Sequence, residues 1–208
     1  MKLDELLALS GDDPLFGSSL LTDRCNPAQA QLQLSRWHRA GKIIQIRKKL
    51  YCFGQPYRKR EPHPFYIARR LKPLSYVSLY SALAFHGIAQ APPEVQCITL
   101  NRPERLETPF GSFLFRRIKK RLYSGYNPID VRDGQQADVA SAEKALLDLL
   151  YLVPHSDNWG YRRNLNLDHI ERLQEDIMRE LVEQSGSEKL RRAARKVYLS
   201  MKAAKRNT

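Results

Sequence analysis

The clearest helical pattern in the chain lies in residues 26–41. Asn26 is a strong N-cap residue and Pro27 suits the first helical position, so a helix is predicted from residue 27 to residue 40. Ala30, Leu34 and Trp37 share one face of that helix, which predicts that this face is buried. Gly41 follows at the position where a left-handed residue usually ends a helix.

A short β-rich stretch follows this helix directly. Residues 43–47 and 50–53 read as two strands, and Lys48 and Lys49 form the tip between them. Before the helix, residues 3–9 carry an apolar helical face and residues 18–25 suggest a second short helix. Helix, helix, capped helix and hairpin is the order of a winged helix-turn-helix, which we predict for residues 1–56.

The pattern changes after a segment rich in proline and charge, residues 57–64, which reads as a linker. Beyond it, helical and alternating patterns are mixed. Strands are predicted at residues 75–77, 95–101, 105–109 and 111–118, with a loop and one short strand at 131–140. Helices are predicted at residues 65–71, 78–86, 141–153, 168–184 and 188–206. The predicted fold class is α+β, with a mixed α/β domain at residues 65–208 that ends in long helices.

Charge is concentrated in the predicted winged helix. Residues 24–60 hold ten Lys or Arg and no Asp or Glu, out of a formal net charge of +13 for the whole chain. Residues 1–23 sum to −4, with one basic and five acidic residues, and residues 61–208 sum to +7, with 24 basic and 17 acidic residues. Positive charge gathered on one small module is typical of a phosphate-binding surface. The alternative is a solvated basic surface that serves solubility.

The composition predicts a cytoplasmic protein. The chain has no apolar run of about 18 residues, and its amphipathic, acidic first residues do not resemble a signal peptide. Its three cysteines, Cys25, Cys52 and Cys97, are far apart and odd in number, which argues against a disulfide framework or a zinc site. Cys52 and Cys97 lie in β-like runs and are expected to be core residues rather than nucleophiles.

The sequence offers no motif of an enzyme, a metal site or a cofactor site. The five histidines show no metal-ligand spacing, and no glycine-rich phosphate loop or nucleophile elbow is present. A nuclease site built on Glu143 or Asp148 would need a second acid nearby, such as Asp130, Asp133 or Asp138. Asp148 lies four residues after Lys144, which favours a local ion pair. We therefore expect no enzymatic activity, no cofactor and no metal.

The expected DNA contacts come from the exposed side of the capped helix and from the hairpin tip. Gln29 and Gln31 suit adenine edges, Arg36 or Arg39 suits guanine edges, and Ser35 suits a base or a phosphate. The wing would contribute phosphate or minor-groove contacts through three residues: Arg47, Lys48 and Lys49. For two further basic clusters, a secondary DNA contact and a solvated surface are equally expected. These clusters are Arg58, Lys59 and Arg60 in the linker, and Arg191, Arg192 and Arg195 in the last helix.

Three stretches of the chain resemble the AbiEi family of antitoxins and transcriptional regulators of type IV toxin–antitoxin (abortive infection) systems. They are SRWHRAGKIIQIRKKLYCF, YVSLYSALAFHGIAQAPPEVQCITLNR and VASAEKALLDLLYL, within residues 30–152. The pairing of Ser-Ala-Leu-x-x-His-Gly (residues 81–87) with Glu-Lys-Ala-Leu-x-Asp (residues 143–148) makes the resemblance fairly specific. The family usually has proline where this chain has Ala142.

The resemblance implies a repressor that binds inverted repeats upstream of its own operon. It also implies that the C-terminal domain counteracts a cognate nucleotidyltransferase-like toxin, without requiring a stable complex. The residues themselves leave alternatives open: a module that binds nucleic acid without sequence preference, including RNA, an enzyme acting on nucleic acid, or a relative with only the regulatory role. They do not specify the operator, the toxin or the oligomeric state.

Overall fold

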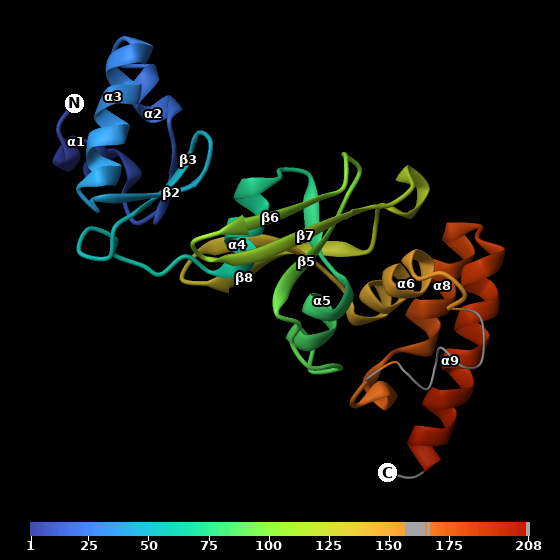
Figure 1. Ribbon diagram of the computed structural model, residues 1–208. Coiled ribbons are helices and arrows are strands. Elements are labelled where there is room, and N and C mark those ends of the chain that lie inside the picture. The colour runs from blue at the N-terminus through green and yellow to red at the C-terminus, as the bar shows by residue number, and fades with distance from the viewer. Residues whose placement is uncertain (157–164, 166, 207–208) are drawn as a thin grey trace. The chain divides into compact units, whose positions relative to one another are not determined.

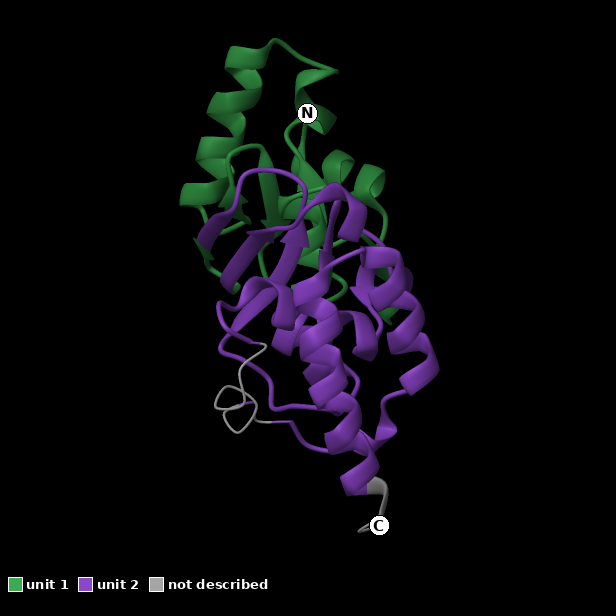
Figure 2. Ribbon diagram, turned by 90° about the vertical axis from the view of Figure 1, so that its right-hand side faces the viewer, with its two compact units in different colours: residues 1–73, 107–111, 130–136 green, residues 74–106, 112–129, 137–208 purple. Residues whose placement is uncertain are grey.

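The structure, a computed structural model, describes residues 1–156, 165 and 167–206 as a mixed α+β protein with two sheets, the fold class that the sequence predicts. The chain divides into two compact units (Figure 2). Unit 1 consists of residues 1–73, 107–111 and 130–136, and unit 2 of residues 74–106, 112–129 and 137–208. No helix among the described residues is long and apolar enough to cross a membrane.

Unit 1 contains the helix–helix–capped helix–hairpin order that the sequence predicts, with one added strand (Figure 1). Its elements are α1 (Leu3–Ser10), β1 (Leu15–Gly17), α2 (Ser19–Thr22), α3 (Pro27–Arg39), β2 (Ile43–Arg47), β3 (Leu50–Phe53) and α4 (Pro64–Leu71). The three strands form an antiparallel sheet in the order β1-β3-β2. β1 is too short to show a period of two in the sequence. It is defined by its pairing with β3, in which Phe16 lies opposite Tyr51.

The core of unit 1 lies between α3, α1 and the sheet. Ala30, Leu34 and Trp37 are buried as predicted, and they join one cluster with residues of α1 and all three strands. The rings of Phe16 and Phe53 lie 4.6 Å apart in this cluster. Close packing of large side chains around α3 fixes the orientation of the helix, and therefore which of its residues face outward.

Helix α4 belongs to unit 1, although the sequence assigned residues 65–71 to the second domain. The carboxylate of Asp13 accepts hydrogen bonds from Tyr66 Oη at 2.9 Å and from Arg70 Nη1 at 2.8 Å. His63 caps α4 through Nδ1, which accepts from the backbone N–H of Phe65 at 3.2 Å. The predicted linker, residues 57–64, likewise lies within unit 1. Polar contacts between residues far apart in the sequence hold α4 there, so a local pattern did not reveal them.

Unit 2 contains helices and most of a six-stranded sheet. The strand order of this sheet is β6-β7-β5-β4-β9-β8. Its strands are β4 (Ser75–Val77), β5 (Glu94–Thr99), β6 (Glu104–Thr108), β7 (Gly111–Arg117), β8 (Tyr126–Arg132) and β9 (Gln135–Ala140). β4 pairs antiparallel with β5 and parallel with β9, and β5 pairs parallel with β7. The residues that join β8 to β9 are grouped with unit 1.

The prediction of a loop with one short strand at residues 131–140 is correct only in part, because β9 lies there but the preceding strand, β8, was missed. Residues 126–140 form two strands, β8 and β9, joined by a tight turn in which the Asp130 carboxylate accepts from the backbone N–H of Gly134. β8 contains Pro128 and has no buried residue, so its sequence resembles a loop. In unit 2 the ring of Tyr126 stacks on that of Tyr76 with centroids 4.5 Å apart.

The remaining helices are α5 (Leu79–Phe85), α6 (Ala142–Leu152), α8 (Glu175–Ser185) and α9 (Glu188–Arg206), with 3-10 turns η1 (Lys120–Leu122) and η2 (Ile170–Arg172). α6 packs against α5, α8 and α9. The predicted helix at residues 168–184 begins later, at Glu175, because residues 170–172 form the separate turn η2. Leu190, Ala194, Val197 and Met201 form a buried stripe along α9.

Candidate nucleic-acid interface

Helix α3 begins and ends as its sequence dictates. The side chain of Asn26 accepts a hydrogen bond from the backbone N–H of Ala28 at 2.9 Å, and Pro27 occupies the first turn. At the other end, Gly41 has a φ of +67°, which a glycine adopts without strain. The backbone N–H of Lys42 then donates to the carbonyl of Trp37 at 2.9 Å. The chain therefore turns directly from α3 into β2.

The predicted base-reading residues of α3 are accessible. Gln29, Gln31, Arg36 and Arg39 are exposed, and Ser35 is half-buried. They do not all lie on one flank of the helix. Arg39 points away from the core. Gln31 lies two turns before His38 on the same side of α3, and His38 Nδ1 is 3.2 Å from the carbonyl oxygen of Ile43 in β2, so this flank is the one on the hairpin side.

Gln29 and Arg36 lie on the other flank of α3, where they line a hollow of about 250 Å³. The rest of its lining comes from α3 itself and from segments before it: Leu32 and Gln33, with Met1, Leu21 and Cys25. Leu32 is 53% exposed, on the helix face opposite the core. An exposed leucine between two polar flanks suits contact with a thymine methyl group, so the structure adds Leu32 to the candidate base contacts.

The hairpin presents Lys48 and Lys49 at its tip, and both side chains are exposed. Lys49 has a φ of +70°, a left-handed conformation that is uncommon for a residue with a side chain. At the base of the hairpin, a Cβ on Gly54 would lie 2.3 Å from the carbonyl oxygen of Gly41, so only glycine fits there. The backbone N–H of Gly54 donates to the carbonyl of Lys42 at 2.8 Å, which closes the hairpin.

Arg47, the third predicted wing contact, is already engaged within unit 1. Its Nη1 lies 3.4 Å from the carbonyl oxygen of Leu71, the last residue of α4. A cation at the C-terminal end of a helix is stabilised by the helix dipole. Arg47 is exposed and so remains accessible, but its position shows a structural role that sequence reasoning did not identify.

The two predicted secondary clusters also have internal partners. Arg58 pairs with Glu61 at 2.7 Å, and Lys59 and Arg60 each lie 3.0 Å from a carboxylate oxygen of Asp12. These cations therefore neutralise acids of unit 1. The three arginines of α9 are exposed, and Arg191 forms an ion pair with Glu188. By contrast, among the described residues no ion pair involves Arg36, Arg39, Lys48 or Lys49.

The two motifs that carry the family resemblance pack together inside unit 2. Residues 81–87 belong to α5 and the turn after it, and residues 143–148 belong to α6, which packs on α5. His86 Nε2 lies 2.8 Å from the carbonyl oxygen of Ala140, and the Ser81 hydroxyl accepts from the backbone N–H of Gln96 at 2.8 Å. These polar side chains therefore satisfy backbone groups.

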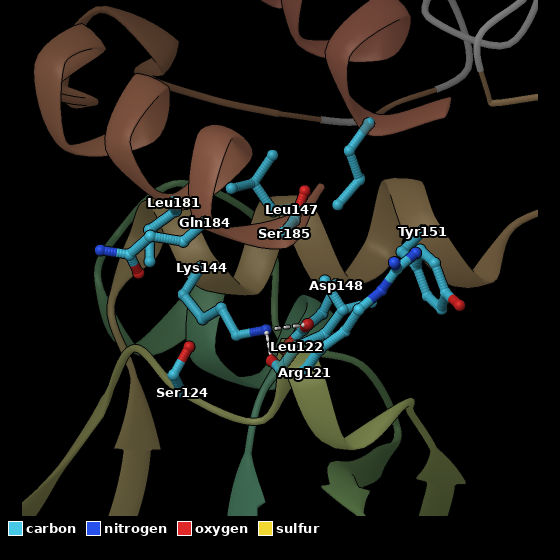
Figure 3. Close-up of a pocket in the computed structure, with 11 residues that line it drawn as sticks. Arg121, Leu122, Ser124, Lys144, Leu147, Asp148, Tyr151, Leu181, Gln184 and Ser185 are labelled. Carbon is cyan, nitrogen blue, oxygen red and sulfur yellow. Dashed lines mark hydrogen bonds and ion pairs between the residues drawn. The ribbon is translucent and has the colours of Figure 1, made fainter. Parts of the chain in front are cut away.

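The predicted ion pair of α6 is buried at the centre of a polar network (Figure 3). Lys144 Nζ donates to Asp148 Oδ1 at 2.5 Å and to the carbonyl oxygen of Leu122 at 2.6 Å. The other carboxylate oxygen of Asp148 accepts from the hydroxyls of Tyr76 and Ser78, each at 2.8 Å. Complete burial raises the pKa of Asp148 above its ordinary value, and the Lys144 ammonium opposes that rise.

Ser78 precedes α5 but does not cap that helix with its side chain. The Ser78 hydroxyl donates to Asp148 instead, and no side-chain cap is formed. A buried carboxylate needs donors more than an N-terminal backbone amide needs an acceptor, because unpaired buried charge is the costlier defect. By contrast, Ser141 caps α6 through a hydrogen bond from the backbone N–H of Lys144 at 3.1 Å.

The predicted core cysteines are buried, with exposed fractions of 0% for both Cys52 and Cys97. Burial raises the pKa of the Cys52 thiol to about 11 and raises that of Cys97 as well. Both thiols are therefore protonated at neutral pH and unreactive. Within the part of the chain that the structure describes, no group of three or more His, Cys, Asp or Glu side chains could hold a metal ion.

Sequence reasoning missed one strongly basic segment, RRIKKR at residues 116–121. Its charge was averaged into the total of the second domain, and its first residues were assigned to a strand. The structure shows that it crosses from the end of β7 into η1. A count of charge in six-residue windows would have found it, since five of its six residues are Arg or Lys.

The comparisons with known proteins identify no family for this chain. No protein-family model matches it, and a search of curated proteins finds no match. The interface must therefore be interpreted from its own geometry.

Proposed function

We propose that this protein is a sequence-specific DNA-binding repressor whose unit 1 acts as a winged helix-turn-helix. In this proposal α3 enters the major groove and the tip of the β2–β3 hairpin lies against the phosphate backbone. The observation that carries the proposal is the exposed polar face of α3 next to two exposed lysines, both fixed on a packed core. Such an arrangement presents donors for base edges and cations for phosphates at the same time.

The cations of α3 and of the hairpin tip are available to contact a ligand. Among the described residues, Arg36, Arg39, Lys48 and Lys49 have no ion pair to break before they contact DNA. Binding phosphate costs less free energy at cations without internal partners, because no ion pair within the protein is broken and no carboxylate is left unpaired. The paired cluster at residues 58–60 is a weaker candidate for the same reason.

The resemblance to AbiEi proteins extends the proposal to an antitoxin that represses its own operon through inverted repeats and counteracts a nucleotidyltransferase-like toxin. What supports this part is the juxtaposition of the two motifs on α5 and α6. Co-expression with a nucleotidyltransferase encoded by an adjacent gene tests it: rescue of growth supports the antitoxin role, and continued growth arrest at matched expression contradicts it.

The DNA-binding proposal is tested by fluorescence anisotropy with labelled duplex from the region upstream of the protein's own gene, and with a scrambled duplex, across a salt series. We expect discrimination of about a thousandfold or more for the specific site. Arg36→Ala should relax sequence preference, whereas Lys49→Ala should weaken both duplexes equally and flatten the salt slope by about one unit. Equal affinity of the wild-type protein for both duplexes would instead indicate binding without sequence preference.

A further inference from the structure

A second basic surface lies on unit 2, at the end of β7 and in η1. We call it the β7–η1 surface and define it by the four exposed cations of residues 116–121: Arg117, Lys119, Lys120 and Arg121. The fifth cation, Arg116, is half-buried, and its Nη2 lies 3.5 Å from the carbonyl oxygen of Leu152 at the end of α6. Four like charges in five consecutive residues repel one another unless a partner neutralises them.

The described part of the chain provides no such partner. None of the four cations takes part in an ion pair among these residues. The basic triplet at residues 58–60 differs, because each of its cations pairs with Asp12 or Glu61. An uncompensated cluster with its charged groups in solvent is the pattern expected of a site for an external polyanion.

The β7–η1 surface adjoins a hollow of about 650 Å³, which lies within unit 2. Arg117, Lys119 and Lys120 line one part of the hollow, and the other part is apolar or aromatic. The latter residues are Leu100, Ile118 and Tyr151. Leu100 and Tyr151 are half-buried and Ile118 is buried. The hollow is large enough for a nucleotide, and it combines cations with an aromatic side chain.

Hydrogen bonds fix the backbone segments that carry the lining residues of this hollow. Lys189 Nζ donates to the carbonyl oxygens of Tyr151 and Val153, at 2.8 and 2.5 Å, which fixes the end of α6. Lys144 Nζ holds the carbonyl of Leu122 in η1, as Figure 3 shows. The backbone N–H of Ile118 donates to the carbonyl of Thr99 at 3.2 Å. The backbone that carries the cations is therefore ordered before any ligand binds, which lowers the entropic cost of binding.

We propose that the β7–η1 surface binds single-stranded nucleic acid. The backbone phosphates lie along Arg117, Lys119, Lys120 and Arg121, and one unstacked base enters the hollow and packs against Tyr151. A duplex fits this site less well, because its bases are stacked and paired and present no free face to an aromatic side chain. The inference does not rest on the proposed operator binding, since it uses only residues of unit 2.

The test uses the full-length protein and labelled single strands of about twelve nucleotides, as RNA and as DNA, in anisotropy titrations across a salt series. Lys119→Glu combined with Lys120→Glu should weaken binding at least tenfold and lower the salt slope by about 0.7 for each phosphate that is no longer bound. The matched control is Arg172→Glu combined with Lys202→Glu, which makes the same change in charge on two exposed positions of unit 2, in η2 and α9, that do not line the hollow. This control should change affinity less than threefold.

The aromatic contact has its own variant. Tyr151→Ala should weaken single-strand binding by about fivefold or more, while Tyr151→Phe should retain it, because stacking needs the ring and not the hydroxyl. Circular dichroism verifies that each variant is folded. A preference for RNA or for DNA identifies which single strand is the ligand, and either preference supports the proposal.

Two results would overturn it. The first is an equal loss of affinity in the Arg172→Glu/Lys202→Glu control, which would reduce the effect to net charge. The second is a Lys119→Glu/Lys120→Glu variant that binds single strands normally but loses affinity for duplex DNA, which would make this surface part of a duplex interface. Normal single-strand binding together with failure of operator binding would disprove the proposed function alone, so the two proposals are separable.

Discussion

The two units use charged side chains in opposite ways. In unit 2, Lys144 and Asp148 are buried in a closed network, with exposed fractions of 4% and 1%. In unit 1, the cations of α3 and of the hairpin tip lie in solvent above an apolar core. A buried pair is hard to alter without loss of folding, whereas exposed cations can change with little effect on the fold. The comparison therefore separates residues that hold the protein together from residues available for a ligand.

The largest expected effect is on the buried pair. Asp148→Ala should reduce the free energy of unfolding by about 3–5 kcal/mol, because it leaves the Lys144 ammonium buried without a counter-charge and removes the acceptor of Tyr76 and Ser78. Urea unfolding followed by circular dichroism measures this loss. Adding Lys144→Met should recover part of it, since the double variant no longer buries an unpaired charge. A double variant less stable than Asp148→Ala would show that Lys144 contributes by packing.

The next effect compares the outward face of α3, which carries Arg39, with the flank that lines the hollow, which carries Arg36. Arg36→Ala and Arg39→Ala should each change unfolding stability by less than about 0.5 kcal/mol, because both side chains are exposed. If either arginine makes a bidentate base contact, its removal should cost about 1–3 kcal/mol of specific binding. Anisotropy with operator and scrambled duplex measures the difference. A larger effect of Arg39→Ala would place the outward face of α3 on the bases, and a larger effect of Arg36→Ala would place the flank with the hollow there.

A smaller effect, with opposite signs for folding and binding, is expected at the hairpin tip. Lys49→Gly should stabilise unit 1 by about 0.5–1 kcal/mol, because glycine tolerates a φ of +70° better than lysine. The same change should weaken binding to every duplex, since it removes a cation that binds phosphate. Lys48→Ala is the control: Lys48 has no positive φ, so this change should affect binding alone. A Lys49→Gly protein less stable than the wild type would contradict the strain argument.

The smallest effect is a pH dependence at the start of α4. Burial, and then the charge of Arg132, lowers the pKa of His63 below its ordinary value. The unfolded chain therefore binds a proton at a higher pH than the folded chain. The stability contributed by His63 is fully present above about pH 6.5 and is lost as pH falls through the folded pKa.

His63→Asn provides the comparison for this prediction, because asparagine keeps an acceptor for the backbone N–H of Phe65 but does not titrate. Between pH 7 and pH 5 the wild-type urea midpoint should fall further than that of the variant. Parallel curves for the two proteins would show that another group accounts for the pH dependence.

The sequence alone determined the elements whose signals are local. Asn26, Pro27 and Gly41 define α3, the β-rich run at residues 43–53 with its Lys48-Lys49 tip defines the hairpin, and the spacing of Lys144 and Asp148 predicted their pairing. The candidate base contacts of α3 were accessible to the same reasoning, because a helical period separates the buried Ala30, Leu34 and Trp37 from the exposed side. Capping, turn chemistry and periodicity depend on neighbours within a few residues, so they can be recognised without a fold.

Tertiary structure decided what depends on residues far apart in the chain. The assignment of α4 to unit 1 follows from contacts of Asp13 with Tyr66 and Arg70, and β1 exists because β3 pairs with it. The triplet at residues 58–60 and the run at residues 116–121 look alike as sequences. Only the fold shows that the triplet is paired with acids, whereas three cations of the β7–η1 surface line one part of a hollow in unit 2. Charge is a property of composition, but whether it is neutralised or available is set by which residues the fold brings near it.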